Sequence, residues 1–256
     1  MTVNDVYLFT EQLAPFKYQD RYDNSGFLIG EPDAKITRIC LCLDITLDII
    51  AEAVEKGANL IISHHPVIFK PISGIKAETP VHELIKRGIN VISAHTNTDA
   101  VFMADAMLDV LGFPCSNEFV EVVAENVGYG KIVNLPAPLS PAELALKCKN
   151  AFNSPFVKYV DGKKPVSRAA VFPGSASSIF DYASVRDCDA FITGEVKHSL
   201  FVEAENRGVT LIEAGHYHTE IVFCEFLKNK LYENFKNIEQ NSIFIAENSK
   251  DFCKYI

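Results

Sequence analysis

Apolar and polar positions follow two different periods along this chain. Short β-branched runs predict strands, and segments with apolar residues three or four apart predict amphipathic helices. The expected strands are residues 27–29, 37–43, 60–63, 91–94, 119–123, 129–135, 156–160, 168–172, 190–193, 209–214 and 243–246. The expected helices are residues 3–13, 47–56, 78–87, 99–111, 179–185, 196–207 and 219–235, with another starting at Ser140. This alternation predicts an α/β fold with largely parallel strands in mixed sheets.

Two α/β lobes are expected, because the strand–helix rhythm runs through both halves of the chain. The stretch 113–117 interrupts that rhythm. The predicted lobes are therefore residues 1–117 and 118–256, and the C-terminal helix is free to pack back on the first lobe.

Two helix ends carry local signals. Ser140, Pro141 and Glu143 match a capping box with proline at the first helical position. Gly88 suits the residue that follows a helix, where a left-handed backbone is common. We expect a helix to begin at the first signal and another to end at the second.

Composition excludes some classes of protein. With 256 residues, nearly half of them apolar, the chain can bury a substantial core. Its net charge of -9 disfavours nonspecific nucleic-acid binding. The N-terminus lacks a basic leader, and no apolar run approaches the ~20 residues of a membrane span, so a cytoplasmic protein is expected. Seven cysteines without framework spacing suit reduced thiols, and Cys40 and Cys42 are expected in a buried strand rather than as ligands.

Histidines follow directly after three of the expected strands. His64 and His65 follow the strand ending at Ser63, His95 opens a segment that ends at Asp99, and the third segment is Gly215–Glu220. Functional sites of open α/β sheets lie outside the carboxyl ends of the strands. We therefore expect these segments to deliver His, Asp and Glu side chains to one sheet edge, as a divalent metal site requires.

Each segment also has an ordinary structural explanation. Adjacent residues of an extended strand point in opposite directions, so His64 and His65 serve one site only if the chain turns, and otherwise they are polar loop residues. Asp99 stands where a helix is expected to begin, so it suits an N-cap as well as a ligand. His95 suits a ligand or a residue that orients one.

The third segment places His216 and Glu220 four residues apart. If a helix starts near Gly215, these two side chains share a face and suit metal binding. His218 then points elsewhere, towards substrate or solvent. Glu195 ends a fourth strand, where it suits a helix-end charge, a general base or a group that orients a ligand.

Two further histidines and one turn are also considered as parts of a functional site. His82 is expected on a helix surface, and His198 is a weaker candidate ligand than the histidines at strand ends. The small-residue turn 172–178 suits either an anion site or an ordinary connecting loop.

Taken together, these motifs resemble the Nif-three-like family of dinuclear-metal-centre proteins, whose members are called GTP cyclohydrolase 1 type 2 homologs. The matching segments, in family order, are Asp23–Gly30, Ser63–Pro66, His95–Asp99, Thr193–Glu195 and Gly215–Glu220. The resemblance implies two α/β domains and a homohexameric ring. The metal ligands that it implies are His64, His65, Asp99, His216 and Glu220.

Three positions depart from the family pattern. Tyr22 stands where the family often has Trp, the turn at Gly174 contains fewer glycines, and His218 replaces a small residue. The departure at Gly174 weakens a phosphate-binding interpretation of that turn. His218 is placed to change the pocket or to add a ligand.

Five protein ligands exceed the four of a single tetrahedral zinc ion, and they suit two divalent ions with a bridging carboxylate and water. Zinc, iron, manganese and nickel all accept this donor set. The resemblance implies a metal-dependent hydrolase in which metal-bound hydroxide attacks GTP, another nucleotide or a related heterocycle. Glu195 and His218 are the candidates for proton transfer. The alternative is a non-enzymatic protein that stores, delivers or inserts metal, or acts as a scaffold.

Overall fold

The structure is a computed structural model that describes residues 1–181, 187–236, 238–239 and 241–254. The chain divides into two compact units. The first unit contains Met1–Thr98 and Phe223–Lys250, and the second contains Asp99–Val222 and Asp251–Ile256. Most of the helix expected over residues 179–185 lies outside the described residues. Among the described residues, no helix combines the length and apolarity needed to cross a bilayer.

The division between the units falls elsewhere than the expected boundary at residue 117. It lies between Thr98 and Asp99, inside a continuous helical stretch. The physical reason is packing, because Met107, Leu108 and Leu111 of that stretch belong to the hydrophobic core of the second unit. Local sequence signals such as Pro114 carry no information on which core a helix joins.

The first unit is built on a five-stranded sheet with the order β1-β4-β3-β2-β11. Its pairings are parallel except for β1 with β4. The strands are β1 (Gly26–Ile29), β2 (Ile39–Cys42), β3 (Leu60–Ser63), β4 (Asn90–Ser93) and β11 (Ile243–Ile245). The helical segments are α1 (Val3–Leu13), η1 (Phe16–Tyr18), α2 (Leu47–Glu55), α3 (Pro80–Arg87), α4 (Thr96–Thr98) and α10 (Val222–Asn234).

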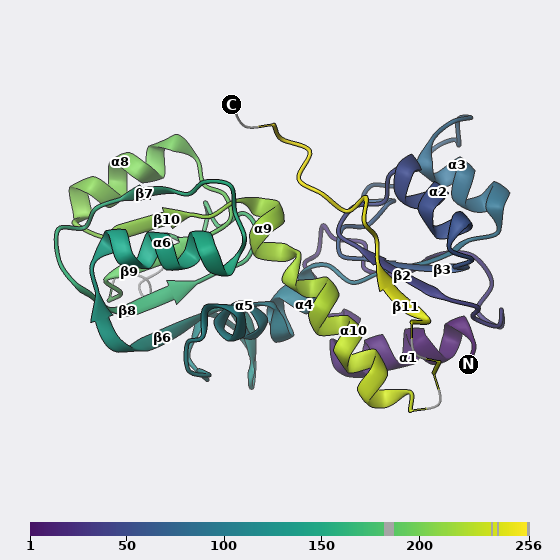
Figure 1. Cartoon of the computed structure of the whole chain (residues 1–256), viewed down its shortest axis with the longest axis horizontal. Helices are drawn as coiled ribbons and strands as arrows, with labels where there is room; N and C mark the ends of the chain where they lie inside the picture. Colours follow the sequence, from purple (N-terminus) through teal and green to yellow (C-terminus); the bar gives the residue numbers. More distant parts are fainter. Residues whose placement is uncertain (182–186, 237, 240, 255–256) are drawn as a thin grey trace. The chain divides into compact units, whose positions relative to one another are not determined.

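Helices cover both faces of this sheet. Figure 1 shows α2 and α3 over one face and α1 with α10 over the other. A parallel sheet covered on both faces reads as continuous apolar runs, and every residue of β2, β3 and β4 is buried. Cys40 and Cys42 lie in this core as free thiols, which confirms their predicted place. Burial raises the pKa of the Cys40 thiol to about 12, so this thiol stays protonated at neutral pH.

The second unit contains a six-stranded sheet with the order β5-β6-β8-β9-β10-β7. Its strands are β5 (Phe119–Ala124), β6 (Val127–Leu139), β7 (Lys158–Val160), β8 (Val166–Val171), β9 (Ala190–Thr193) and β10 (Thr210–Glu213). Only β8, β9 and β10 pair in parallel among the described residues, so this sheet is mixed rather than largely parallel. The predicted α/β class is confirmed, but the antiparallel share of this sheet is larger than the alternation suggested.

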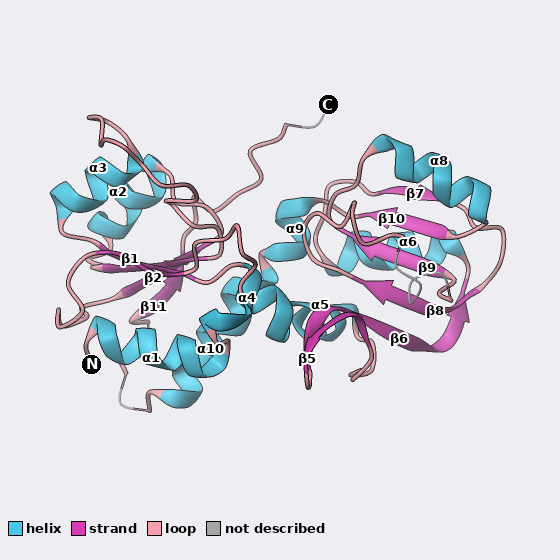
Figure 2. Cartoon of the chain, turned by 180° about the vertical axis from the view of Figure 1, so that it is seen from behind, coloured by secondary structure: helices cyan, strands magenta, loops and turns pink. Residues whose placement is uncertain are grey.

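Helices of the second unit pack against this sheet (Figure 2). They are the π-helical segment η2 (Asp99–Met103), α5 (Ala104–Leu111), α6 (Pro141–Ala151) and α8 (His198–Arg207), whereas α9 (His216–Glu220) lies beyond the ends of the strands. Apolar residues of α5 and α6 share one hydrophobic core with β6, β8 and β9.

Two predicted helix ends are confirmed and two differ. The Ser140 hydroxyl accepts the Glu143 N–H while the Glu143 carboxylate accepts the Ser140 N–H, and Gly88 ends α3 with a φ of 64°. The helix expected from residue 99 begins at residue 96 instead, so Asp99 is not an N-cap. The helix expected from residue 219 begins three residues earlier, at His216.

A buried carboxylate ties the C-terminal part of the first unit to α2. Glu52 accepts hydrogen bonds from Lys56 Nζ (2.8 Å), the Glu247 N–H (2.8 Å) and both the backbone and the side-chain nitrogen of Asn248 (3.0 and 2.9 Å). Burial alone raises its pKa, but these donors outweigh burial and lower the pKa to about 2, against 4.5 for an ordinary Glu. The ionised Glu52 side chain therefore helps to hold the segment after β11 against α2.

This carboxylate makes stability depend on pH. Because its folded pKa lies below its unfolded pKa, Glu52 stabilises the fold above pH 4.5, and that contribution disappears as the pH falls towards 2. We expect Glu52→Gln to cost roughly 2–3 kcal/mol of unfolding free energy at pH 7 and almost nothing near pH 2. Urea unfolding at several pH values measures this difference. The exposed neighbour Glu55→Gln is the control, and equal losses at both pH values would contradict the prediction.

Candidate metal centre

Three imidazoles gather in the first unit, where β3 and β4 end. Backbone hydrogen bonds hold the segment after β3, because the N–H groups of His64 and His65 donate to the carbonyls of Cys42 (3.1 Å) and Leu43 (2.9 Å). His95 follows the neighbouring strand β4. One nitrogen from each of the three rings lies within 4.8 Å of the corresponding atoms of the others. Imidazole nitrogens this close together form a candidate site for a divalent ion.

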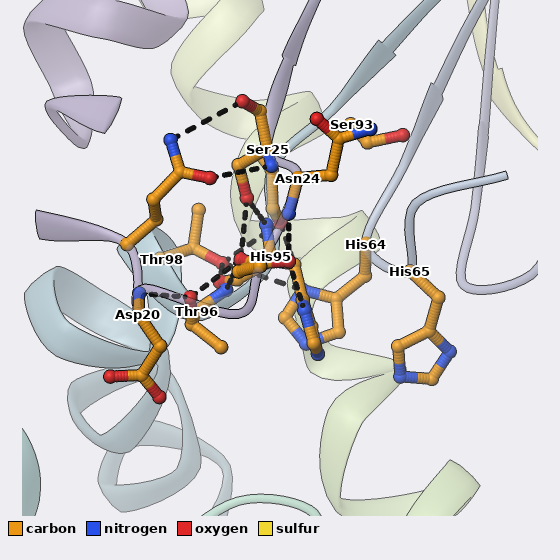
Figure 3. A network of polar contacts seen from close by, with 12 residues as sticks. Asp20, Asn24, Ser25, His64, His65, Ser93, His95, Thr96 and Thr98 are labelled. Atoms are coloured by element: carbon orange, nitrogen blue, oxygen red, sulfur yellow. Dashed lines mark hydrogen bonds and ion pairs between the residues drawn. The ribbon is translucent and has the colours of Figure 1, made fainter. Parts of the chain in front are cut away.

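The two adjacent histidines do not point in opposite directions. Their ring centroids are 5.2 Å apart, and each ring lies within 5.3 Å of the His95 ring. The chain turns after β3, where the Ser63 hydroxyl donates to the His65 carbonyl (2.8 Å). Figure 3 shows the His64 and His65 rings extending to the same side of the chain. The sequence did not decide whether the chain turns after β3. It does turn, so the His64 and His65 rings both lie in the group of three imidazoles.

An oxygen atom faces Nδ1 of each ring. The partners are the Ala94 carbonyl for His64 (2.9 Å), Asp44 for His65 (2.8 Å) and Asp23 for His95 (2.9 Å). A carbonyl or carboxylate only accepts, so each Nδ1 carries the hydrogen when the ring is neutral, and each Nε2 keeps its lone pair. Metal-binding histidines show the same arrangement, in which an outer oxygen fixes the ring and its tautomer.

Asp23 organises much of the surrounding polar network. Its carboxylate accepts from His95 Nδ1, from the Ser25 hydroxyl (2.9 Å), from the Asn24 N–H (2.7 Å) and from both the N–H (3.1 Å) and the hydroxyl (2.5 Å) of Thr96. Burial alone raises the Asp23 pKa, but the bonds from His95 and Thr96 hold that pKa well below its usual range. Asp23 thus joins the segment before β1 to the segment after β4.

The second unit holds a further pair of candidate ligands on α9. His216 Nε2 lies 3.1 Å from the buried carboxylate of Glu220, four residues later. On its other side, His216 Nδ1 lies 3.0 Å from Glu195, whose side chain is mostly exposed. The helical spacing predicted for His216 and Glu220 is confirmed. Of the roles left open for Glu195, its contact with His216 favours orienting that ring.

A glycine makes room for this pair. Gly174 has a φ of 55°, and a Cβ at that position would overlap Glu220 Oε1 and lie 3.4 Å from His216 Nε2. The Gly174 carbonyl accepts from the N–H groups of Gly194 and Glu195, both at 2.9 Å. The turn at Gly174, which was considered as an anion site, therefore packs directly against the Glu220 carboxylate. A carboxylate at this position favours a bound cation over a phosphate.

The remaining candidates occupy different positions. His218 is half-buried, with Nε2 3.5 Å from the Asp251 carboxylate, and the absence of a side chain at Gly215 leaves space for its ring. Asp99 belongs to the second unit, as the first residue of η2. His82 contacts Glu83 (3.3 Å) on α3, as expected for a helix-surface histidine, and His198 is exposed.

One expectation about the site is wrong. The three histidine-bearing segments do not follow strands of the same sheet, because the strand before Gly215 is β10, which pairs with β9 and β7 in the second sheet. Pairing partners depend on distant residues, and the histidine pattern contains no information on them. The sequence contains no signal for the contact between Asp44 and His65. Asp23 lies in one of the segments that match the family, but its role in orienting His95 was not predicted.

These two groups of donors fit divalent metal ions, since they combine oriented imidazoles with a buried carboxylate. A family model described as Duf34/NIF3 (NGG1p interacting factor 3) matches residues 1–251. The chain belongs to this family.

Relatives of this Duf34/NIF3 protein match it along nearly its whole length. A GTP cyclohydrolase 1 type 2 homolog from Clostridium acetobutylicum is 31% identical over 265 residues, covering 100% of this chain and 99% of the relative. GTP cyclohydrolase 1 type 2 from Helicobacter pylori is 31% identical over 251 residues, covering 92% and 97%. The crystal structure of Staphylococcus aureus hypothetical protein SA1388 superposes with a TM-score of 0.91 at 28% identity, covering 100% and 99%.

Proposed function

We propose that this Duf34/NIF3 protein binds two divalent metal ions per chain and uses them to hydrolyse a nucleotide or a related heterocycle. The proposed ligands are His64, His65, Asp99, His216 and Glu220. The observation that carries the proposal is the fixed orientation of the histidine rings, whose Nδ1 atoms all face oxygen acceptors. The family resemblance supports joining these residues in one dinuclear centre, and the curated name of the Helicobacter pylori relative supports a nucleotide substrate.

When bound, divalent ions polarise an electrophile and lower the pKa of a bound water. The residues of the chain prepare the ligands for this chemistry. The Ala94 carbonyl and Asp44 hold His64 and His65 through Nδ1, and Glu195 acts on His216 as a positioning residue. Glu195 also has an exposed carboxylate that can accept a proton from solvent or substrate. His218, outside the proposed ligand set, is the second candidate for proton transfer.

The first test is the metal content of protein purified without an affinity tag and then reconstituted. We expect two ions per chain at saturation, measured by elemental analysis. A content that never exceeds one ion per chain would contradict the dinuclear centre. The homohexameric ring stays a prediction, which light scattering checks on the same samples.

The second test separates chemistry from metal binding. We expect Glu195→Gln and His218→Ala to keep most of their metal and to lower turnover about 10- to 100-fold, the range found for groups that support a metal ligand. Glu125→Gln, an exposed carboxylate in the β5–β6 turn, is the matched control. Full activity in both variants would remove them from the mechanism. Fully metallated wild type that turns over neither nucleotides nor related heterocycles would favour the metal-handling alternative.

A further inference from the structure

We propose that Tyr22, Phe69 and His95 form a stacking subsite that receives the planar base of an anionic nucleotide. This proposal rests on the proposed function and names the part of the molecule that recognises the substrate ring. Each of the three residues lies in the first unit, so the subsite is built within a single compact unit.

The three rings form a row that leads from the surface to the imidazole group. The Tyr22 and Phe69 ring centroids are 6.1 Å apart, and the Phe69 and His95 centroids are 6.2 Å apart. Tyr22 is 64% exposed and Phe69 is 39% exposed, so both side chains reach solvent. His95 in turn lies 5.3 Å from the candidate ligand His65. A base stacked on this row would therefore lie beside the proposed metal ligands.

The backbone positions of this row are fixed by hydrogen bonds. The Asn24 side chain donates to the carbonyl of Ile68 (2.5 Å), which directly precedes Phe69. Asp23, the residue after Tyr22, accepts from His95 Nδ1 (2.9 Å). The two residues that directly follow Tyr22 therefore anchor the residue before Phe69 and the ring of His95. A surface held in its binding conformation loses less conformational entropy when a ligand binds.

Two exposed basic residues next to the rings favour an anionic ligand, because the side chain of the acidic neighbour Asp23 is fully buried and already accepts from His95. Arg21 immediately precedes Tyr22, Lys70 immediately follows Phe69, and both basic residues are exposed. In a chain with a net charge of -9, basic residues beside both exposed aromatic residues run against the overall charge. Nucleotides present a planar ring and an anionic phosphate chain together. Stacking accepts any base because every base has a π-face, so the subsite recognises this class rather than guanine alone.

The test measures nucleotide affinity in the metal-loaded full-length protein by calorimetry. The probes are GTP, ATP and the ringless inorganic triphosphate. We expect Phe69→Ala and Tyr22→Ala each to weaken binding of both nucleotides by about tenfold or more, since base stacking is worth ~1–3 kcal/mol per base. Binding of triphosphate should change less than twofold. The ring-retaining variants Phe69→Trp and Tyr22→Phe should keep wild-type affinity, and Tyr159→Ala, at an exposed tyrosine of β7, controls for loss of any aromatic residue.

The outcomes separate this proposal from the hydrolase proposal. Unchanged nucleotide affinity in both alanine variants overturns the stacking subsite, even if the wild type hydrolyses nucleotides. If nucleotide binding depends on the rings but the protein hydrolyses no nucleotide, the stacking subsite is supported and the hydrolase proposal is contradicted. Alanine variants that change oligomeric state while keeping nucleotide affinity would assign these rings to a contact between chains and overturn the proposal.

Discussion

Replacing His65 with alanine is expected to lower the affinity for divalent metal by at least ~100-fold, above the 10- to 100-fold typical of outer partners. The fold should remain, because the ring is partly exposed and its Nδ1 bond to Asp44 lies at the edge of the core. Elemental analysis and circular dichroism of the same samples measure both effects. Bound metal still adds some stability to the wild type through mass action.

The matched control is His82→Ala, which removes a partly exposed imidazole from α3 of the same unit. It should change neither metal content nor secondary structure. If His65→Ala retains its metal, His65 is not a ligand. If the chelated wild type loses its secondary structure, the site is structural and the hydrolase proposal weakens.

Replacing Gly174 with alanine is expected to remove metal from the second unit's ligand pair. The new Cβ would overlap Glu220 Oε1, so the buried carboxylate or the turn must move. The backbone has a φ of 55°, which adds roughly 1–2 kcal/mol of strain for a residue with a Cβ. We expect a loss of metal affinity comparable to that of Glu220→Ala, together with a lower melting temperature.

Gly208→Ala separates the effect of backbone strain from the effect of the overlap with Glu220. Gly208 has a φ of 64° in the same unit, and its nearest neighbour lies 3.8 Å from an added Cβ. This control carries the backbone strain without the overlap, so it should lower stability and keep the metal. Equal metal contents in Gly174→Ala and Gly208→Ala would show that the close approach at Gly174 does not position Glu220.

Most of the local structure follows from sequence patterns within single elements. The helix at residues 3–13 was predicted with the bounds the structure has, and β3 was predicted to end at Ser63. These elements follow from side-chain periodicity, and the ends of α6 and α3 follow from capping residues that act within a few positions. The spacing of His216 and Glu220 likewise fixes their proximity, because one helical turn brings them together.

Which distant groups meet, by contrast, depends on how the elements pack together. The pairing of β10 with β9, the assignment of α5 to the second unit and the antiparallel edges of its sheet all depend on cores assembled from remote segments. The oxygens that hold His64, His65 and His95 come from Ala94, Asp44 and Asp23, between 21 and 72 positions away along the chain. A periodic pattern describes one element at a time, whereas orientation of a ligand requires the hydrogen-bond partner that folding places beside it.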